Sequence, residues 1–269
     1  MNFLYAIPAA LLLTLALAIT LLLAGVGQYL VHRRFHQQDF IAHNEVGGII
    51  IAVAGTLYAV VLGFLTVVVW QHFQEARELV VTESDANIDA WHAAVGLPPA
   101  IRARVRGDMV AYTDLMIHRE WPAMRRGEFD ETAPMIDMDA FDAAGSFVPV
   151  NEGQSNAQAA TLQQLTQMHD ARQKRTVING DGVSGFEWLV LLLGASCMIA
   201  FCWLFGLRNI RVQMLMTSAV VAIIVSTLVL LFELQYPFRS DIGIGPQAWT
   251  NAAQHIHQMQ SGMLMNMRN

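Results

Sequence analysis

The chain has few charged residues and almost no lysine. Only 14% of its 269 residues are charged, whereas 54% are apolar, and Lys174 is the single lysine. No run of Lys or Arg exceeds two residues, so the sequence offers no basic surface for nucleic acid. This composition excludes an ordinary soluble domain and predicts an integral membrane protein in contact with a lipid bilayer.

Sequence signatures of catalysis are also missing. The chain contains no G-x-S-x-G motif, no glycine-rich phosphate loop and no H-E-x-x-H motif. His255 and His257 supply two imidazoles without an obvious third ligand, so we predict no metal site. Cys197 and Cys202 fall on different faces of a predicted helix, which disfavours a disulfide between them. We therefore expect neither an enzyme nor a cofactor.

Four apolar segments are long enough to cross a membrane. They cover residues 3–24, 46–70, 186–207 and 212–232. The first is too long for the core of a signal peptide and no basic residue precedes it, so we expect it to be retained. Gly25 and Gly27 predict that this first helix frays soon after residue 24.

The second span is predicted to continue far beyond the membrane. After Gly63, no Pro or Gly interrupts the chain until Gly96, and apolar residues recur at helical spacing through Phe73, Ala76 and Val80. We therefore expect an all-α membrane protein with four transmembrane helices, in which a long second helix extends into a helical extramembrane domain.

The remaining segments divide the chain into four parts. Residues 1–70 hold the first two spans, 71–183 the extramembrane domain, 184–233 the last two spans and 234–269 a tail. Within the domain we expect amphipathic helices over residues 100–121 and 157–177. Residues 125–154 read as a loop with short helical pieces, and the tail as one weak helix over residues 246–264.

Two stripes run along the second span. Small residues at positions 48, 52, 55, 59 and 63 would let another helix approach closely, as is typical of helix packing in membranes. Thr56, Val60 and Phe64 form a neighbouring stripe. The periodicity by itself favours ordinary packing inside the membrane for both stripes.

Part of this region resembles a known family. Leu62-Gly63-Phe64 is followed, after eight residues, by Phe73-x-Glu75-Ala76-Arg77, and this spacing is similar to the end of the second helix of bacterial bestrophins. The chain as a whole resembles the bestrophin-like family of uncharacterised bacterial membrane proteins, through motifs that include Glu83, Glu120-Trp121, Arg172-x-x-Arg175 and Pro237-Phe238.

The resemblance implies a function. Bestrophins are pentameric ion channels whose second helix lines a pore with a hydrophobic neck, which would fall on Thr56, Val60 and Phe64. The chain departs from them at residues 65–70, where Leu-Thr-Val-Val-Val-Trp replaces polar and basic residues, and this departure argues against a preference for anions. Inorganic ions and further copies of the chain are the expected partners.

Several charged residues have two interpretations. Glu83 continues the Phe73, Ala76, Val80 stripe, so it is expected to face other helices, where a carboxylate needs a partner. It either pairs with Arg172 or Arg175, or repeats around an oligomer axis as an acidic ring that favours cations. Glu45 could form a similar ring at the start of the span. The other residues that we expect to form structural ion pairs are Glu75, Arg77 and Glu120.

Two functions remain open. One is an oligomeric ion channel of the bacterial inner membrane, and the other is a nonconducting membrane scaffold that binds a partner protein, which the apolar residues 65–69 favour. Arg33, Arg34, Arg208 and Arg211 mark one side of the membrane, and nearly as many basic residues flank the other. We expect the large domain in the cytoplasm, as the resemblance implies.

Overall fold

The computed structural model of the protein describes residues 2–35, 40–41, 43–207 and 209–266, and these residues form helices and no strand. Arg208 lies outside the described residues. Four helices are long and apolar enough to span a membrane: α1 (Ala9–Arg34), α3 (Asn44–Ala93), α8 (Gly185–Trp203) and α9 (Ile210–Leu234). The predicted all-α fold with four candidate spans and a long second helix is confirmed.

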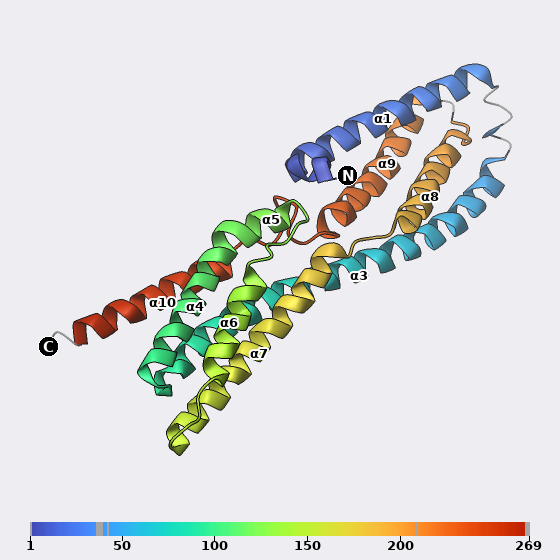
Figure 1. The fold of residues 1–269 in the computed structure, drawn as a ribbon. Coiled ribbons are helices and arrows are strands. Elements are labelled where there is room, and N and C mark those ends of the chain that lie inside the picture. Colours follow the sequence, from blue (N-terminus) through green and yellow to red (C-terminus); the bar gives the residue numbers. More distant parts are fainter. Residues whose placement is uncertain (1, 36–39, 42, 208, 267–269) are drawn as a thin grey trace. The chain divides into compact units, whose positions relative to one another are not determined.

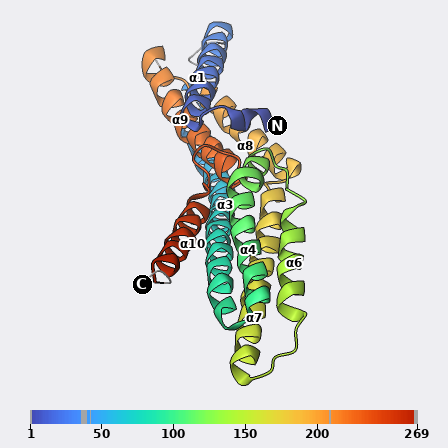
Figure 2. The same ribbon diagram turned by 60° about the vertical axis from the view of Figure 1, so that its left-hand side comes forward.

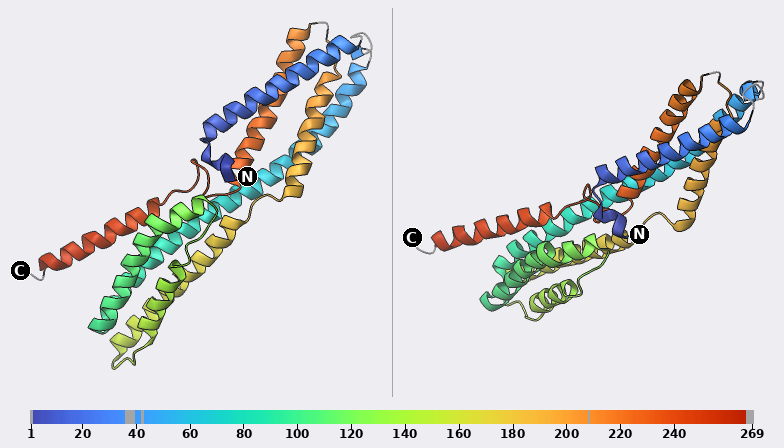
Figure 3. Two further views of the ribbon diagram at one scale, coloured as in Figure 1. Left: turned by 45° about the horizontal axis from the view of Figure 1, so that its top comes forward. Right: turned by 90° about the horizontal axis from the view of Figure 1, so that it is seen from above.

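The chain divides into two compact units, which are described separately. The first comprises Met1–His72, Gly182–Gln235 and Ser240–Ile242. In it α1 packs along α9, and α8 packs against both (Figures 1 and 3). Ala24, Val221 and Val225 form one small core, and Ala195, Met198 and Ile224 form another. Most other large apolar side chains of these helices are exposed, as expected for helices that meet lipid or further protein.

The first helix is longer than predicted. It does not fray after Ala24 but continues through both glycines to Arg34. A Cβ atom on Gly27 would lie only 2.3 Å from the Trp203 ring, so this glycine permits close approach of the two residues. One residue further, Gln28 is buried and accepts a hydrogen bond of 3.2 Å from the Thr217 hydroxyl. Neither glycine ends the helix, and Gly27 serves the packing of α1 on Trp203.

The second unit comprises Phe73–Asp181, Tyr236–Arg239 and Gly243–Asn269. Alongside the second part of α3 it contains a short 3₁₀ turn, η2 (Ala94–Gly96), and the helices α4 (Pro99–Leu115), α5 (Trp121–Arg125), α6 (Ala133–Gly145), α7 (Glu152–Gly180) and α10 (Gln247–Asn266) (Figure 2). A one-turn π-helix, η3 (Met116–Glu120), joins α4 to α5. The shared core contains Trp91, Met109, Tyr112, Leu165 and Trp249.

Side-chain caps fix the starts of two long helices. The Asn151 side chain accepts the Gln154 N–H at the start of α7. Ser184 and Glu187 form a reciprocal capping box at the start of α8. Polar residues just before these two helices thus satisfy some of their first free N–H groups.

Two segments are more ordered than the sequence indicates. Residues 133–145, read as short helical pieces, form the single helix α6, which packs on α4 and α7. The tail helix α10 is part of the second unit: Trp249 is fully buried, and the Ser84 hydroxyl donates to the Ala248 carbonyl at 3.1 Å. The tail is therefore built into the core of this unit.

Candidate functional site

The membrane part of α3 packs on α8 through one face. Asn44 exchanges two hydrogen bonds with the backbone of Gly206, at 2.8 and 3.0 Å. About two to four turns further on, Ile51, Ala54 and Tyr58 contact the small core around Met198, and the Tyr58 hydroxyl donates to the Leu191 carbonyl at 3.2 Å. These spacings of three and four residues place the contacts on one side of the helix.

The Thr56, Val60 and Phe64 stripe lies on the other side of α3. At 3.6 residues per turn its centre is about 150° around the helix from the face that packs on α8. All three side chains are exposed in the protomer, Val60 by 49% and Phe64 by 71%. The stripe is therefore free to meet lipid or copies of the same chain.

The small-residue stripe lies beside it. Ala52, Ala59 and Gly63 are exposed, and a Cβ atom on Gly48 or Gly63 would meet nothing within 4 Å. At Gly55, a Cβ atom would lie 3.7 Å from the Met198 sulfur, so this position faces α8. Room for close approach of a further helix thus lies next to the stripe of Thr56, Val60 and Phe64.

Three of the charged residues singled out from the sequence lie on the surface of α3. Glu45 is exposed in the first turn, and Glu75 and Arg77 are exposed further along the helix. Among the described residues, none of the three has an oppositely charged group within 4 Å. Structural ion pairs of Glu75 and Arg77 therefore do not form within the described part of the protomer.

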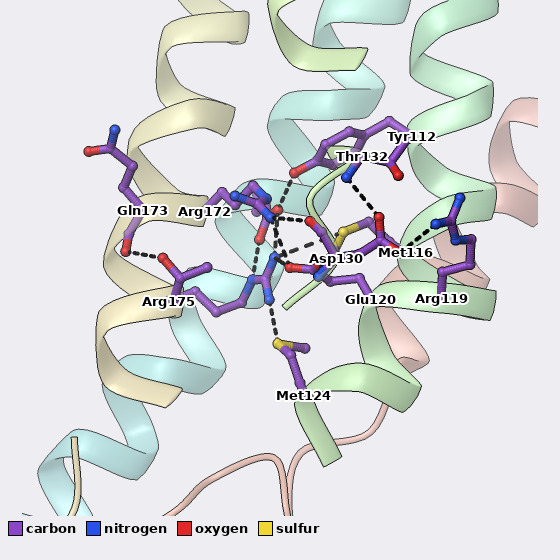
Figure 4. Close-up of polar contacts among 12 residues, drawn as sticks. Tyr112, Met116, Arg119, Glu120, Met124, Asp130, Thr132, Arg172, Gln173 and Arg175 are labelled. Carbon is purple, nitrogen blue, oxygen red and sulfur yellow. Dashed lines mark hydrogen bonds and ion pairs between the residues drawn. The ribbon is translucent and has the colours of Figure 1, made fainter. Parts of the chain in front are cut away.

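Glu83 lies in the centre of the second unit, paired with Arg175. Both side chains are fully buried, and the guanidinium donates to the two carboxylate oxygens at 2.6 and 3.1 Å. The Tyr112 hydroxyl donates to the same carboxylate at 2.6 Å. Figure 4 shows that Arg175 also points toward the sulfur of Met124, at 2.6 Å from its Nη1 atom. Every strong acceptor around this guanidinium is thus provided within one protomer.

Glu120 and Arg172 form the second half of the cluster. Arg172 donates to Glu120 at 3.1 Å, and Arg175 approaches the same oxygen at 3.6 Å. The other Glu120 oxygen accepts the backbone N–H of Asp130 at 2.8 Å. Asp130 in turn pairs with Arg119 at 2.9 Å (Figure 4). Two glutamates therefore balance two arginines in the buried part of the cluster, so little net charge is left unpaired.

The cluster draws its side chains from many elements, which is why the sequence reveals only part of it. Glu83 comes from α3, Tyr112 from α4, Glu120 from the π-helix and Arg172 and Arg175 from α7. The π-turn inserts an extra residue and re-aims the side chains that follow it. The sequence indicated Tyr112 only as a packing position and Met124 only as part of the motif that begins at Glu120, and it did not indicate Asp130. No local pattern marks a residue whose partner comes from another helix.

The surroundings of Arg175 and Tyr112 shift the pKa values of both side chains upward. Burial by itself would lower the pKa of Arg175, but the adjacent Glu83 carboxylate outweighs burial and raises this pKa above its usual value. Burial, reinforced by Glu83, raises the pKa of Tyr112 well above its usual range, so the phenol stays a neutral donor. The arrangement holds helices together and presents no group poised for acid or base chemistry.

These contacts correct the interpretation of Glu83 as an acidic ring. A pore-lining carboxylate must face water, whereas Glu83 is fully buried and its charge is neutralised by Arg175 in the same protomer. Asn87, one turn further, is also buried and donates to Thr113 at 2.9 Å. In the described part of the chain, no three His, Cys, Asp or Glu side chains come together in an arrangement that could hold a metal ion.

Comparisons with known proteins give a consistent result. A family model described as the Bestrophin-like domain matches residues 18–249. The fold is similar to that of a bacterial bestrophin homolog from Klebsiella pneumoniae, with a TM-score of 0.69 and 16% identity over 91% of this chain and 98% of that chain. A variant of a Klebsiella pneumoniae bestrophin homolog with one mutation gives a TM-score of 0.70 and 14% identity, with the same coverage. No curated protein matches the sequence.

Proposed function

Because the chain belongs to the Bestrophin-like family, we propose that it is a homo-oligomeric ion channel of the bacterial inner membrane whose α3 helices line the pore. One observation carries this proposal: Thr56, Val60 and Phe64 are exposed on the face of α3 that turns away from α8. A ring of such helices, one from each copy, would bring this stripe to a common axis. We propose a pentamer, the assembly that the resemblance to bestrophins implies.

In this assembly the stripe acts as the neck of the pore. A narrow ring of apolar side chains resists wetting, so ions cross it only when the ring widens or becomes hydrated. Phe64 presents the largest side chain of the three and is 71% exposed, so it would set the narrowest radius. The small residues beside the stripe would let neighbouring copies of α3 pack closely enough to close the ring.

With Glu83 neutralised inside the protomer, Glu45 is the remaining acid that we assign to the conduction path. It is exposed in the first turn of α3, where repeated copies would form an acidic entrance. Such a ring attracts cations, and the apolar residues 65–69 offer no anion-binding group. We therefore propose a channel that favours cations, with residues 71–183 forming a cytoplasmic domain.

Ion flux from purified protein tests the proposal. Protein in liposomes is expected to carry monovalent cations, and Phe64→Ala is expected to increase the flux because it widens and wets the neck. Leu22→Ala is the matched control, since Leu22 is 67% exposed on α1, far from α3 in the sequence. An oligomer that carries no ions across a range of voltages and calcium concentrations, with or without Phe64→Ala, would refute conduction.

A second function is favoured by a specific feature of α3. Leu65 to Val69 is apolar throughout apart from Thr66, and Val67 and Val68 are about half exposed. A wide aqueous path would place polar groups here. A nonconducting scaffold that binds a partner protein through this surface accounts for the same residues, and it predicts a sealed axis and a partner that copurifies in fixed stoichiometry.

A further inference from the structure

A groove in the first unit is lined almost entirely by apolar side chains. It has a volume of 240 Å³ and lies among α1, α8 and α9, where its lining includes Leu12, Ala16, Thr20, Trp188, Leu192 and Phe232. The three α1 residues follow one another at intervals of four, so they lie in a row along one face of the helix. All of these residues belong to helices that are long and apolar enough to span the membrane.

The length of the groove fits one leaflet of a bilayer. From Leu12 to Thr20 the row covers eight residues, or about 12 Å of helix, and one leaflet of the hydrocarbon core is about 15 Å thick. The groove runs with the helices, and helices cross a membrane close to its normal. It therefore lies parallel to the acyl chains that surround the protein.

A polar and aromatic rim closes one end of the groove. The Trp188 indole N–H donates to the Gln235 side chain at 3.1 Å, and the Gln235 amide donates to the Tyr5 hydroxyl at 2.9 Å. The Tyr5 ring stacks on Phe232 with 4.5 Å between centroids. Tyr5 comes from a 3₁₀ turn, η1 (Asn2–Ala6), that precedes α1. Aromatic residues with a polar atom gather at the level of the lipid headgroups, so the rim marks the headgroup end of the groove.

The charged residues of this unit near the rim bear on which lipid headgroups fit there. Glu187 lies next to Trp188, and Asp241 accepts the Ala9 N–H at the start of α1. The arginines of this unit that the structure describes, Arg33, Arg34 and Arg211, all lie at the opposite ends of α1 and α9. A headgroup at the rim therefore meets the carboxylates of Glu187 and Asp241, and none of these three arginines.

We infer that the groove binds one acyl chain of a membrane phospholipid whose headgroup carries an exposed ammonium, such as phosphatidylethanolamine. Van der Waals contact with the acyl chain along about 12 Å of helix supplies the affinity, and the acidic rim disfavours lipids with a net negative headgroup. The inference needs only that these helices cross the bilayer, so it stands apart from conduction.

Retention of lipid by the purified protein tests the site. The full chain is placed in vesicles of equal parts phosphatidylethanolamine and phosphatidylglycerol, extracted in mild detergent and measured by native mass spectrometry. One phosphatidylethanolamine per protomer is expected. Ala16→Leu, which fills the groove, is expected to lower retention about tenfold, as if the acyl chain lost about ten van der Waals contacts between heavy atoms. Ala18→Leu adds the same side chain to an exposed position of the same helix and is expected to retain the lipid.

Equal retention by the two alanine variants would overturn the site, and preferred retention of phosphatidylglycerol would overturn the headgroup assignment. If Ala16→Leu fails to fold, a second measurement tests whether an acyl chain occupies the groove. Acyl chains brominated near the headgroup quench indole fluorescence by contact, so the quenched fraction in wild-type protein is expected to fall in Trp188→Phe. An unchanged quenched fraction would show that no acyl chain reaches the groove.

Discussion

Replacing Glu83 by Gln tests the buried cluster at its centre. Gln has nearly the same shape and still accepts the hydrogen bond from Tyr112, which is 2.6 Å long in the native protein. It removes the charge that holds Arg175 at 2.6 and 3.1 Å, and it leaves the fully buried guanidinium with Glu120 at 3.6 Å as its nearest carboxylate. The change thus leaves the buried Arg175 charge without its closest partner, and does more than delete a contact.

The expected cost follows from that burial. Removing one partner of a buried ion pair typically costs about 3–5 kcal/mol, which corresponds to a fall in Tm of about 10 °C for a chain of this size. Glu128→Gln makes the same chemical change in a pair with Arg126 whose side chains are 61% and 62% exposed. We expect it to cost less than about 1 kcal/mol.

Thermal unfolding in detergent, followed by circular dichroism and by tryptophan fluorescence, measures both variants. The double variant Glu83→Gln with Arg175→Met is expected to recover most of the lost stability, because neither charge remains unpaired and Glu120 keeps Arg172 at 3.1 Å. If Glu83→Gln costs no more than Glu128→Gln, or if the double variant is less stable than the single one, the cluster does not hold the unit together as described.

Three further changes probe other parts of the fold by the same unfolding assay. Gly194→Ala is expected to lower the free energy of unfolding by about 1–3 kcal/mol, because its new methyl group would lie 2.5 Å from the Tyr58 ring. Gly25→Ala is the control: its methyl group would meet nothing within 4 Å, so it is expected to be neutral or stabilising. Trp249→Ala is expected to cost about 3–5 kcal/mol and to release α10, since the Trp249 ring is fully buried. Burial raises the pKa of Asp137, so the folded state binds the Asp137 proton more tightly than the unfolded state does. The stability that this proton contributes is therefore present at low pH and is lost as the pH rises through the folded pKa. Asp137→Asn is therefore expected to raise Tm at pH 7, with the gain vanishing below about pH 4.

Each of these three predictions has a result that would contradict it. Equal Tm values for Gly194→Ala and Gly25→Ala would mean that α3 and α8 do not approach closely at Tyr58. A Trp249→Ala variant of native stability would show that the tail is not part of the core. A Tm for Asp137→Asn below that of the native protein at pH 7 would show that His169, 2.6 Å from Asp137, outweighs the cost of burial.

The parts of the fold that were predictable have strong local signals. Long apolar runs identify the four spans, and the absence of Pro and Gly after Gly63 predicts the continuous α3. Glu83 could be placed in the interior because it continues a helical stripe. The sequence left Arg172 and Arg175 as equal partners for it, and only the crossing of α3, the π-helix and α7 assigns Arg175 to Glu83 and Arg172 to Glu120.

The parts that were missed depend on distant contacts. Gly25 and Gly27 read as helix breakers, yet packing of Trp203 on Gly27 continues α1. The tail helix has a weak pattern, and its burial depends on Trp249 reaching Tyr112, with 5.6 Å between the ring centroids. Local propensity is a weak guide wherever tertiary packing overrides it in this way.

In the proposed channel, the Thr56, Val60 and Phe64 face of α3 surrounds a shared axis. A cryo-EM reconstruction of the purified protein in lipid nanodiscs measures this arrangement through the symmetry of the particle and the distance of Phe64 from the symmetry axis. We expect a rotationally symmetric oligomer in which the Phe64 side chains of all copies converge on the axis. A monomeric particle, or an oligomer whose Phe64 side chains face lipid, would contradict it.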